Sequence, residues 1–229
     1  MVTVLDEIPF VPDADALLRK LRVESSADFA PEIRDVVERA AQVVRPKALF
    51  DVCYVEERGE DTVTIDGITF TSRVLRTALA DVHRVFPFLA TCGTELDALL
   101  AEYNDELLRY SVECLKELAL SAARHHLAAY VKSVYDLPGL SSMHPGSGDA
   151  VVWPIQQQAQ LFRLIGDVES LIGVRLSETY LMQPNKTVSG VFFPSEVSFT
   201  TCRLCRRDRC PGRRAPFDAL LWSETQPEG

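Results

Sequence analysis

The sequence predicts an α+β fold. Helical and strand-like segments mix along the chain without the regular alternation that produces a doubly wound sheet, and no glycine-rich turn joins a strand to a helix. Asp66-Gly67 stands between two short segments, 62–65 and 68–70, and is the strongest hairpin signal in the chain. Together these observations favour helices packed on a sheet that contains a hairpin.

The first half of the chain supplies one clear helix and one further strand. Apolar residues recur at helical spacing from Pro31 to Val44, where the proline suits a first turn, and Pro46 ends the helix. Residues 48–56 alternate and are rich in Val, Phe and Tyr, which predicts a strand. Ser72 is placed to cap a helix after the hairpin.

A long helical region dominates the second half. The apolar run 85–91 predicts a buried strand, and Thr94 then opens a helix that continues to Tyr135 with a break near Asn104. Three further elements are expected: a helix over 155–171 and strands over 174–181 and 187–193.

Length and composition limit the class of protein. The 229-residue chain is long enough for one sizeable domain, and with 47% hydrophobic and 25% charged residues it is too apolar for a disordered one. No window of about 18 uncharged apolar residues occurs, and the first residues lack the features of a signal peptide. We therefore expect a cytoplasmic protein that does not enter a membrane.

Charge is spread unevenly along the chain. The net charge of −9 argues against nucleic-acid binding. Residues 202–214 nevertheless contain six arginines and one aspartate, which indicates either an anionic partner or a solvated surface tail. We therefore divide the chain into a main domain, 1–200, and a Cys/Arg-rich tail, 201–229.

The six cysteines form two groups. Three are isolated in apolar stretches and are expected to be buried thiols: Cys53, Cys92 and Cys114. The other three, Cys202, Cys205 and Cys210, lie within nine residues, and in a reducing compartment such spacing favours a metal or redox site. Three alternatives stay open: a 4Fe–4S cluster with an exchangeable position, a zinc ion completed by a residue that the fold brings near, and thiols without metal.

Five short motifs follow one another in the second half of the chain, and they are densest between residues 141 and 193. In order they are Pro145-Gly-Ser-Gly-Asp149, Trp153-Pro154, Leu161-Phe162, Ile172-Gly-Val-Arg-Leu-Ser-Glu178 and Met182-x-Pro-x-Lys-x-Val-Ser-Gly190. In this order and spacing they resemble the activation domain of cobalamin-dependent methionine synthase, most closely the stand-alone members of that family.

The resemblance implies a C-shaped α+β domain with a bent antiparallel sheet flanked by helices. Members of the family bind S-adenosylmethionine and dock over a cobalamin that a partner domain or protein carries. An electron and a methyl group then return cob(II)alamin to methylcobalamin. The implied partners are a corrinoid-binding methyltransferase and an electron donor.

A ligand groove is expected where the Pro/Gly segment meets the strand that contains Lys186. Glycine lets the backbone approach a ligand closely, acidic groups would receive the amino or sulfonium group of S-adenosylmethionine, and Lys186 and Ser189 would meet its carboxylate or a corrinoid side chain. The groove residues predicted on this basis are Asp97, His144, Pro145, Gly146, Ser147, Gly148, Asp149, Glu178, Lys186, Ser189 and Gly190. The alternative is an ordinary strand turn with a solvated Lys186 and a bulge at Gly190.

The chain departs from the family pattern at the loop itself. Family members read Arg-x-x-Pro-Gly-Tyr there, and the arginine and tyrosine engage S-adenosylmethionine. Ser142 and Ser147 stand at those two positions, and serine does not reproduce the planar fork of arginine. A different ligand, or none, therefore stays an alternative.

Two functions remain after these considerations. The first is an accessory protein that reactivates a corrinoid methyltransferase, with the three clustered cysteines as its metal site; the second is a non-catalytic docking module with a zinc-stapled tail. The chain has no nucleophile triad, Walker loop or HExxH motif, so hydrolysis and phosphoryl transfer are poorly supported. His125-His126 is the one histidine pair, and because neighbouring residues face different sides of a helix it is not expected to form a ligand pair.

Overall fold

Strand β6 (Arg84–Thr91) is the centre of the sheet, because three other strands pair with it. The computed structural model describes residues 1–148, 152–196, 199–207, 209–210, 213 and 215–225. On one side of β6 lie β2 (Lys47–Phe50) and β3 (Cys53–Arg58). Both pair with β6 in antiparallel orientation, and the register does not shift between β2 and β3. On the other side lies β10 (Thr187–Pro194), also antiparallel.

The remaining strands extend the sheet and bend it. At its two edges β1 (Thr3–Leu5) pairs with β2, and β7 (Leu140–Met143) pairs with β10. At one end β4 (Thr62–Ile65) and β5 (Ile68–Thr71) form the predicted hairpin on β3, where an irregularity in the register accompanies the bend. β8 (Arg175–Leu176) and β9 (Met182–Gln183) form a separate short ribbon.

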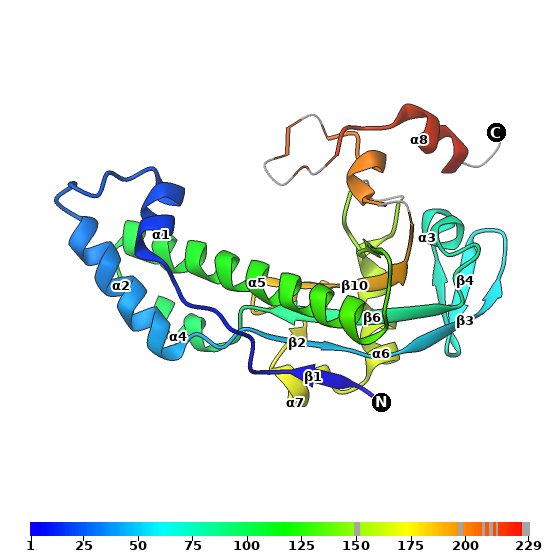
Figure 1. The fold of residues 1–229 in the computed structure, drawn as a ribbon, viewed down its shortest axis with the longest axis horizontal. Helices are drawn as coiled ribbons and strands as arrows, with labels where there is room; N and C mark the ends of the chain where they lie inside the picture. The colour runs from blue at the N-terminus through cyan, green and yellow to red at the C-terminus, as the bar shows by residue number, and fades with distance from the viewer. Residues whose placement is uncertain (149–151, 197–198, 208, 211–212, 214, 226–229) are drawn as a thin grey trace.

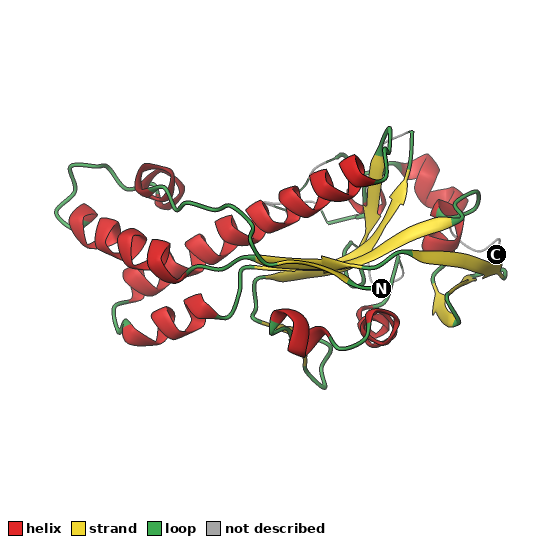
Figure 2. Ribbon diagram, turned by 60° about the horizontal axis from the view of Figure 1, so that its bottom comes forward, coloured by secondary structure: helices red, strands yellow, loops and turns green. Residues whose placement is uncertain are grey.

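Helices cover both faces of the sheet. Figure 1 shows the long helix α5 (Glu106–Val134) running along β2, β6 and β10, while Figure 2 shows shorter helices on the opposite face. Those on the opposite face are α6 (Gln158–Ile165) and α7 (Val168–Ile172). The N-terminal half of α5 packs against α1 (Ala14–Leu21), α2 (Ala30–Val43) and α4 (Glu95–Glu102), and α3 (Arg73–Ala78) lies beside β4.

The central strands are apolar on both faces, which explains why the sequence of β6 is almost wholly hydrophobic. Val85 and Leu89 belong to the core under α6, whereas Phe86 and Phe88 belong to the core under α5. Alternate side chains of a strand point to opposite faces, so this one strand connects two cores. A third core lies among α1, α2, α4 and α5.

Most expected elements are present with shifted boundaries, but two predicted strands differ. The strand expected over 48–56 is divided between β2 and β3, and the strand expected over 174–181 is strand only at β8 and then turns. The helical region after Thr94 breaks at Tyr103–Asp105, as predicted, because the Asp105 carboxylate caps α5 by accepting from the Leu108 N–H. The predicted helix 155–171 is instead three pieces: η1 (Ile155–Gln157), α6 and α7. Gly166, with φ +99, separates α6 from α7. Within the described residues, no helix has the length and apolarity needed to span a membrane.

The tail begins inside the main core. Thr201 and Leu204 of the short helix η2 (Thr201–Leu204) are buried, and Leu204 shares a hydrophobic cluster with Trp153. Trp222, in α8 (Ala219–Thr225), packs against the same cluster. The start of the segment 201–229 is thus packed on the segment 1–200.

We predict that Leu204→Ala lowers the free energy of unfolding of the whole chain by about 2–4 kcal/mol, because it leaves a cavity in the main core. Urea unfolding followed by circular dichroism measures this. Leu220→Ala is the matched control, since Leu220 is 78% exposed and its loss should change little. Equal stability of the two variants would show that the tail is energetically separate.

Candidate functional site

The predicted Pro/Gly loop is held by its own turn chemistry. Gly146 and Gly148 have φ +73 and +90, which favour glycine. The Gly146 N–H donates to the Trp153 carbonyl at 2.8 Å, and the Ser147 N–H donates to the His144 carbonyl at 3.2 Å. Asp149, predicted as part of the groove, lies outside the described residues.

Pro145 interrupts the pairing of β7 with β10. Val191 is opposite Met143 in this ladder, so the next pair of the same kind would join Ser189 to Pro145. Proline has no N–H to donate. The Ser189 carbonyl is met instead by the His144 side chain, whose Nδ1 lies 2.8 Å from the oxygen.

Gly190 makes room for this imidazole. A Cβ at position 190 would overlap the Met143 carbonyl oxygen and would lie 2.7 Å from His144 Nδ1. The register of β10 against β6 continues without a shift through Gly190, so the alternative of a bulge there is wrong. The glycine is needed for the close approach of a side chain from the neighbouring strand.

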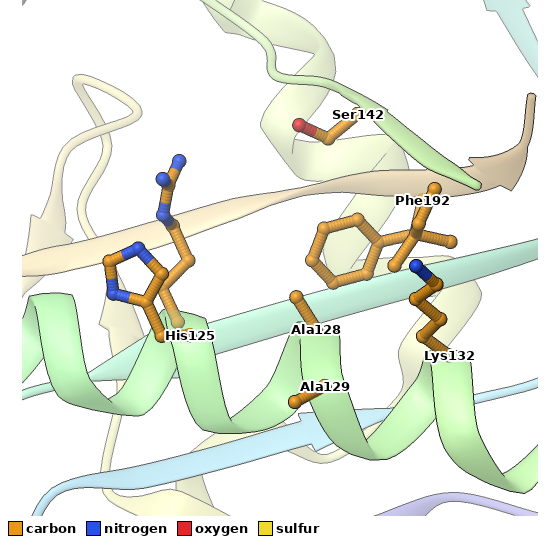
Figure 3. A pocket seen from close by; sticks show the side chains of 8 residues that line it. His125, Ala128, Ala129, Lys132, Ser142 and Phe192 are labelled. Carbon is orange, nitrogen blue, oxygen red and sulfur yellow. The ribbon is translucent and has the colours of Figure 1, made fainter. Parts of the chain in front are cut away.

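The second ring nitrogen of His144 contacts a residue that lines a pocket. Its Nε2 lies 3.1 Å from the Ser142 Oγ, and Ser142 lines a hollow of about 320 Å³ between α5 and the paired strands β7 and β10. Figure 3 shows Ser142 and Phe192 facing the α5 side chains across this pocket. The Phe192 ring is stacked on Phe88 at 3.8 Å, and Phe88 meets His144 edge-on.

Basic side chains line the pocket. Arg124, His125 and Lys132 line it from α5, and the small residues Ala128 and Ala129 between them leave the hollow (Figure 3). None of the described lining residues carries a carboxylate. Basic side chains beside a partly enclosed space favour the binding of an anionic group.

Sequence reasoning did not find this pocket. The sequence presents His125 and His126 as a pair, whereas in the structure His125 lines the pocket together with residues one and two turns further along the helix. The sequence signal for this pocket is the pair Ala128-Ala129, which stands between the basic residues Arg124 and Lys132 at helical spacing. It could not be interpreted without knowing that β7 lies opposite this stretch of α5.

The predicted groove residues lie in separate places. Ser189 is buried, and its hydroxyl donates to Gln158 Oε1 at 2.5 Å, towards α6 and away from the pocket. Glu178 is exposed in the turn after β8. Asp97 and Lys186 belong to a different polar cluster, in which Asp97 lines a second hollow of about 450 Å³ and Lys186 Nζ lies 4.0 Å from Glu113.

A buried lysine organises that second cluster. The Lys116 side chain is only 2% exposed and donates to Asp97 at 2.6 Å and to Glu113 at 3.0 Å. Burial acts to lower the pKa of Lys116, but the two carboxylates outweigh it and the pKa is raised. Burial acts to raise the pKa of Glu113, but hydrogen bonds from Asn185 and Lys116 outweigh it and the pKa is lowered. The cluster is therefore a compensated set of charges.

The cysteine segment lies against the Pro/Gly loop. A Cβ at Gly148 would lie 3.8 Å from the Cβ of Cys205. The Arg213 guanidinium donates to the carbonyls of Cys202 and Cys205 at 3.3 and 3.1 Å and so holds this turn. Within the described part of the chain no three His, Cys, Asp or Glu side chains form a group that could hold a metal ion. A metal site at Cys202, Cys205 and Cys210 stays a prediction.

The other three cysteines are buried, as expected. Cys53, Cys92 and Cys114 are at most 3% exposed, and none of the six cysteines, all of which are described, forms a disulfide. Burial raises the pKa of the Cys92 thiol to about 12, which makes it unreactive at neutral pH.

Comparison with known proteins identifies the fold. No protein-family model matches the sequence, and no curated protein matches it. Among solved structures, the crystal structure of the MetH reactivation domain bound to AdoHcy matches with a TM-score of 0.63 and 14% sequence identity, over 88% of this chain and 81% of that one. At this identity the similarity is one of fold. The chain has the fold of the methionine synthase reactivation domain, and the expected α+β class is confirmed.

We predict that Lys116→Met lowers the free energy of unfolding at pH 7 by about 1–3 kcal/mol, because two carboxylates lose their shared donor. Glu113 has a depressed pKa when folded, so its stabilising effect is present above its unfolded pKa and is lost as the pH falls through its folded pKa. The difference between the variant and the parent should therefore shrink in acid.

Urea unfolding between pH 3 and pH 7 measures that difference. Lys20→Met is the control, because Lys20 forms only a surface pair with Glu117 and its loss should matter little. If the two proteins are equally stable at pH 7, or if the difference in their free energies of unfolding grows in acid, Lys116 does not stabilise the fold through these two carboxylates.

Proposed function

We propose that this chain is an accessory protein for the reductive reactivation of a corrinoid methyltransferase such as methionine synthase. The observation that carries the proposal is the cationic pocket at Ser142, the position where the family pattern has its ligand-binding arginine. The fold adds support, because the similar domain was crystallised with AdoHcy.

The proposed reaction assigns this chain a binding role. One electron and the methyl group of S-adenosylmethionine would convert cob(II)alamin on the partner into methylcobalamin and leave AdoHcy. The corrinoid would belong to the partner. The residues of this chain would hold the nucleoside ligand and present it to the partner's cofactor, and the electron would come from a separate donor or from the cysteine site.

The pocket suits the carboxylate of such a ligand. Ser142 cannot provide a guanidinium fork, but Arg124 and Lys132 reach the same space from α5. A positive charge that other family members place on the strand would thus be supplied by the helix opposite. The Phe192 ring offers an apolar surface beside it (Figure 3).

The charge of the pocket also favours one of the two related ligands. S-adenosylmethionine carries a positive sulfonium that AdoHcy lacks, and the described lining residues provide no carboxylate to receive it. The like charges of Arg124 and Lys132 oppose a sulfonium held nearby. The product form of the cofactor should therefore bind more tightly than the methyl donor.

We predict that AdoHcy binds about fivefold more tightly than S-adenosylmethionine, which corresponds to about 1 kcal/mol of charge repulsion. Lys132→Gln should weaken AdoHcy binding about fivefold and reduce the difference in affinity between AdoHcy and S-adenosylmethionine. Isothermal titration calorimetry at low salt measures both. Arg163→Gln, which removes an exposed charge from α6 on the other face, should leave both affinities unchanged. Tighter binding of S-adenosylmethionine, or an unaffected Lys132→Gln variant, contradicts this role of the pocket.

The second candidate function is a non-catalytic module that docks on a corrinoid protein and whose tail is stapled by zinc. The packing of Leu204 and Trp222 on the main core favours it, because a structural metal would stabilise an element that is already docked. A 4Fe–4S cluster at the same cysteines would favour the first function. The described residues do not form a complete ligand set, so no electron-transfer step is derived through them.

We predict that the protein purified without oxygen contains about one metal site, and that Cys205→Ser removes it while the main domain stays folded. Elemental analysis and the visible spectrum identify the metal, since an iron–sulfur cluster absorbs visible light and zinc does not. Cys114→Ala, a change in the buried middle of α5, is the control that should retain the metal. Metal retained in Cys205→Ser contradicts the site, and unfolding of the whole chain contradicts the expectation that the main domain stays folded without the metal.

A further inference from the structure

The tail presents apolar side chains to solvent beside an excess of positive charge. Leu220 is 78% exposed and Phe217 is 38% exposed, whereas Leu221 and Trp222 of the same helix pack on the main core. The tail segment 199–225 contains six arginines and three acidic residues. The excess is one of number, so it remains however these acidic residues pair with the arginines. Exposed apolar side chains beside charge of one sign are typical of a surface that contacts another protein.

Two hollows adjoin Phe217. Arg206 lines a hollow of about 490 Å³, and Arg203 and Leu220 line a second one of about 510 Å³. Phe217 lines both. The Arg206 guanidinium lies over the Trp222 ring, 4.7 Å from its centre, which fixes a positive charge at the first hollow. An aromatic side chain with a hollow beside it has the shape that interlocks with the side chains of a protein partner.

A second segment of the chain has the opposite charge. The hairpin segment 53–71, which runs from β3 through β5, contains five acidic residues and one basic residue. Glu57 and Glu60 are exposed there, and the aromatic side chain of Tyr54 is 56% exposed. The hairpin segment thus combines negative charge with an exposed apolar surface, which complements the tail segment.

The two segments lie at the same end of the molecule. Helix α3 contacts both α8 of the tail segment and β4 of the hairpin segment. Figures 1 and 2 show α8 and the hairpin at the end opposite α1 and α2. In a two-fold dimer each of two surfaces on one copy meets the other surface on its partner. Because the two segments are neighbours, both of these contacts can form in one dimer.

We propose that two copies of this chain form a two-fold dimer in which the tail segment of each copy docks on the hairpin segment of the other. The arginines of the tail would meet the carboxylates of the hairpin, and Phe217 and Leu220 would be covered beside Tyr54. The net charge of −9 makes two copies repel each other in most orientations, whereas this orientation brings opposite charges together. The inference concerns the assembly of the chain and does not depend on the proposed function.

Charge reversal tests the pairing of the two segments. The tail variant carries Arg207→Glu with Arg209→Glu, and the hairpin variant carries Glu57→Lys with Glu60→Lys; all four positions are exposed. Each variant alone opposes like charges and should dimerise at least about tenfold more weakly. A one-to-one mixture should dimerise again, because the altered tail then meets the altered hairpin and the unaltered tail meets the unaltered hairpin. Recovery in the mixture requires that both variants are folded.

Sedimentation equilibrium measures the association. At about 150 mM salt the repulsion between distant charges is largely screened and close pairs keep their attraction. The unaltered protein should dimerise there with a Kd on the order of 10 μM. Lys20→Glu with Arg34→Glu is the control, because it changes the net charge as the tail variant does but lies in α1 and α2. It should dimerise like the unaltered protein.

Three results overturn the inference. The first is an unaltered protein that is monomeric at about 200 μM, well above the expected Kd. The second is a dimer that persists unweakened in the tail variant or in the hairpin variant. The third is a mixture of the two variants that remains monomeric.

Discussion

The hydrogen bond from His144 to the Ser189 carbonyl is the interaction on which the candidate site depends. It exists because Pro145 has no N–H at the point where β7 would continue its pairing with β10. The imidazole fits only because Gly190 has no side chain. One break in a ladder thus ends the strand, starts the Pro/Gly loop and places Ser142 at the wall of the pocket.

Strand β10 distributes polar groups to both faces of the sheet. On the α6 face the Ser189 hydroxyl is buried against Gln158, and on the α5 face Phe192 faces basic side chains of α5. At its beginning, Lys186 approaches Glu113 in the compensated cluster around Lys116. The residues of this strand therefore contact three separate parts of the structure and do not line a single groove. The reason is that successive residues of a strand point in opposite directions.

Charge is arranged differently at the two hollows. Around Lys116 each positive group has a carboxylate partner, and the shifts of the pKa values of Glu113 and Lys116 reflect that mutual compensation. In the pocket at Ser142 the described lining residues include two permanent cations and no carboxylate. A hollow lined by basic side chains suits an anionic ligand, whereas a compensated cluster stabilises the fold without one.

The sequence by itself determined the local structure. The turn at Asp66-Gly67 and the cap at Ser72 depend on neighbouring residues, and both are present as their chemistry predicts. Tertiary structure alone decided which functional side chains meet. Arg124, Ser142 and Phe192 form one pocket because α5 crosses the sheet above the end of β7, while Lys186 and Ser189, three residues apart, are directed to different neighbours. Periodicity records which face of an element is apolar, but only packing sets which other element covers that face.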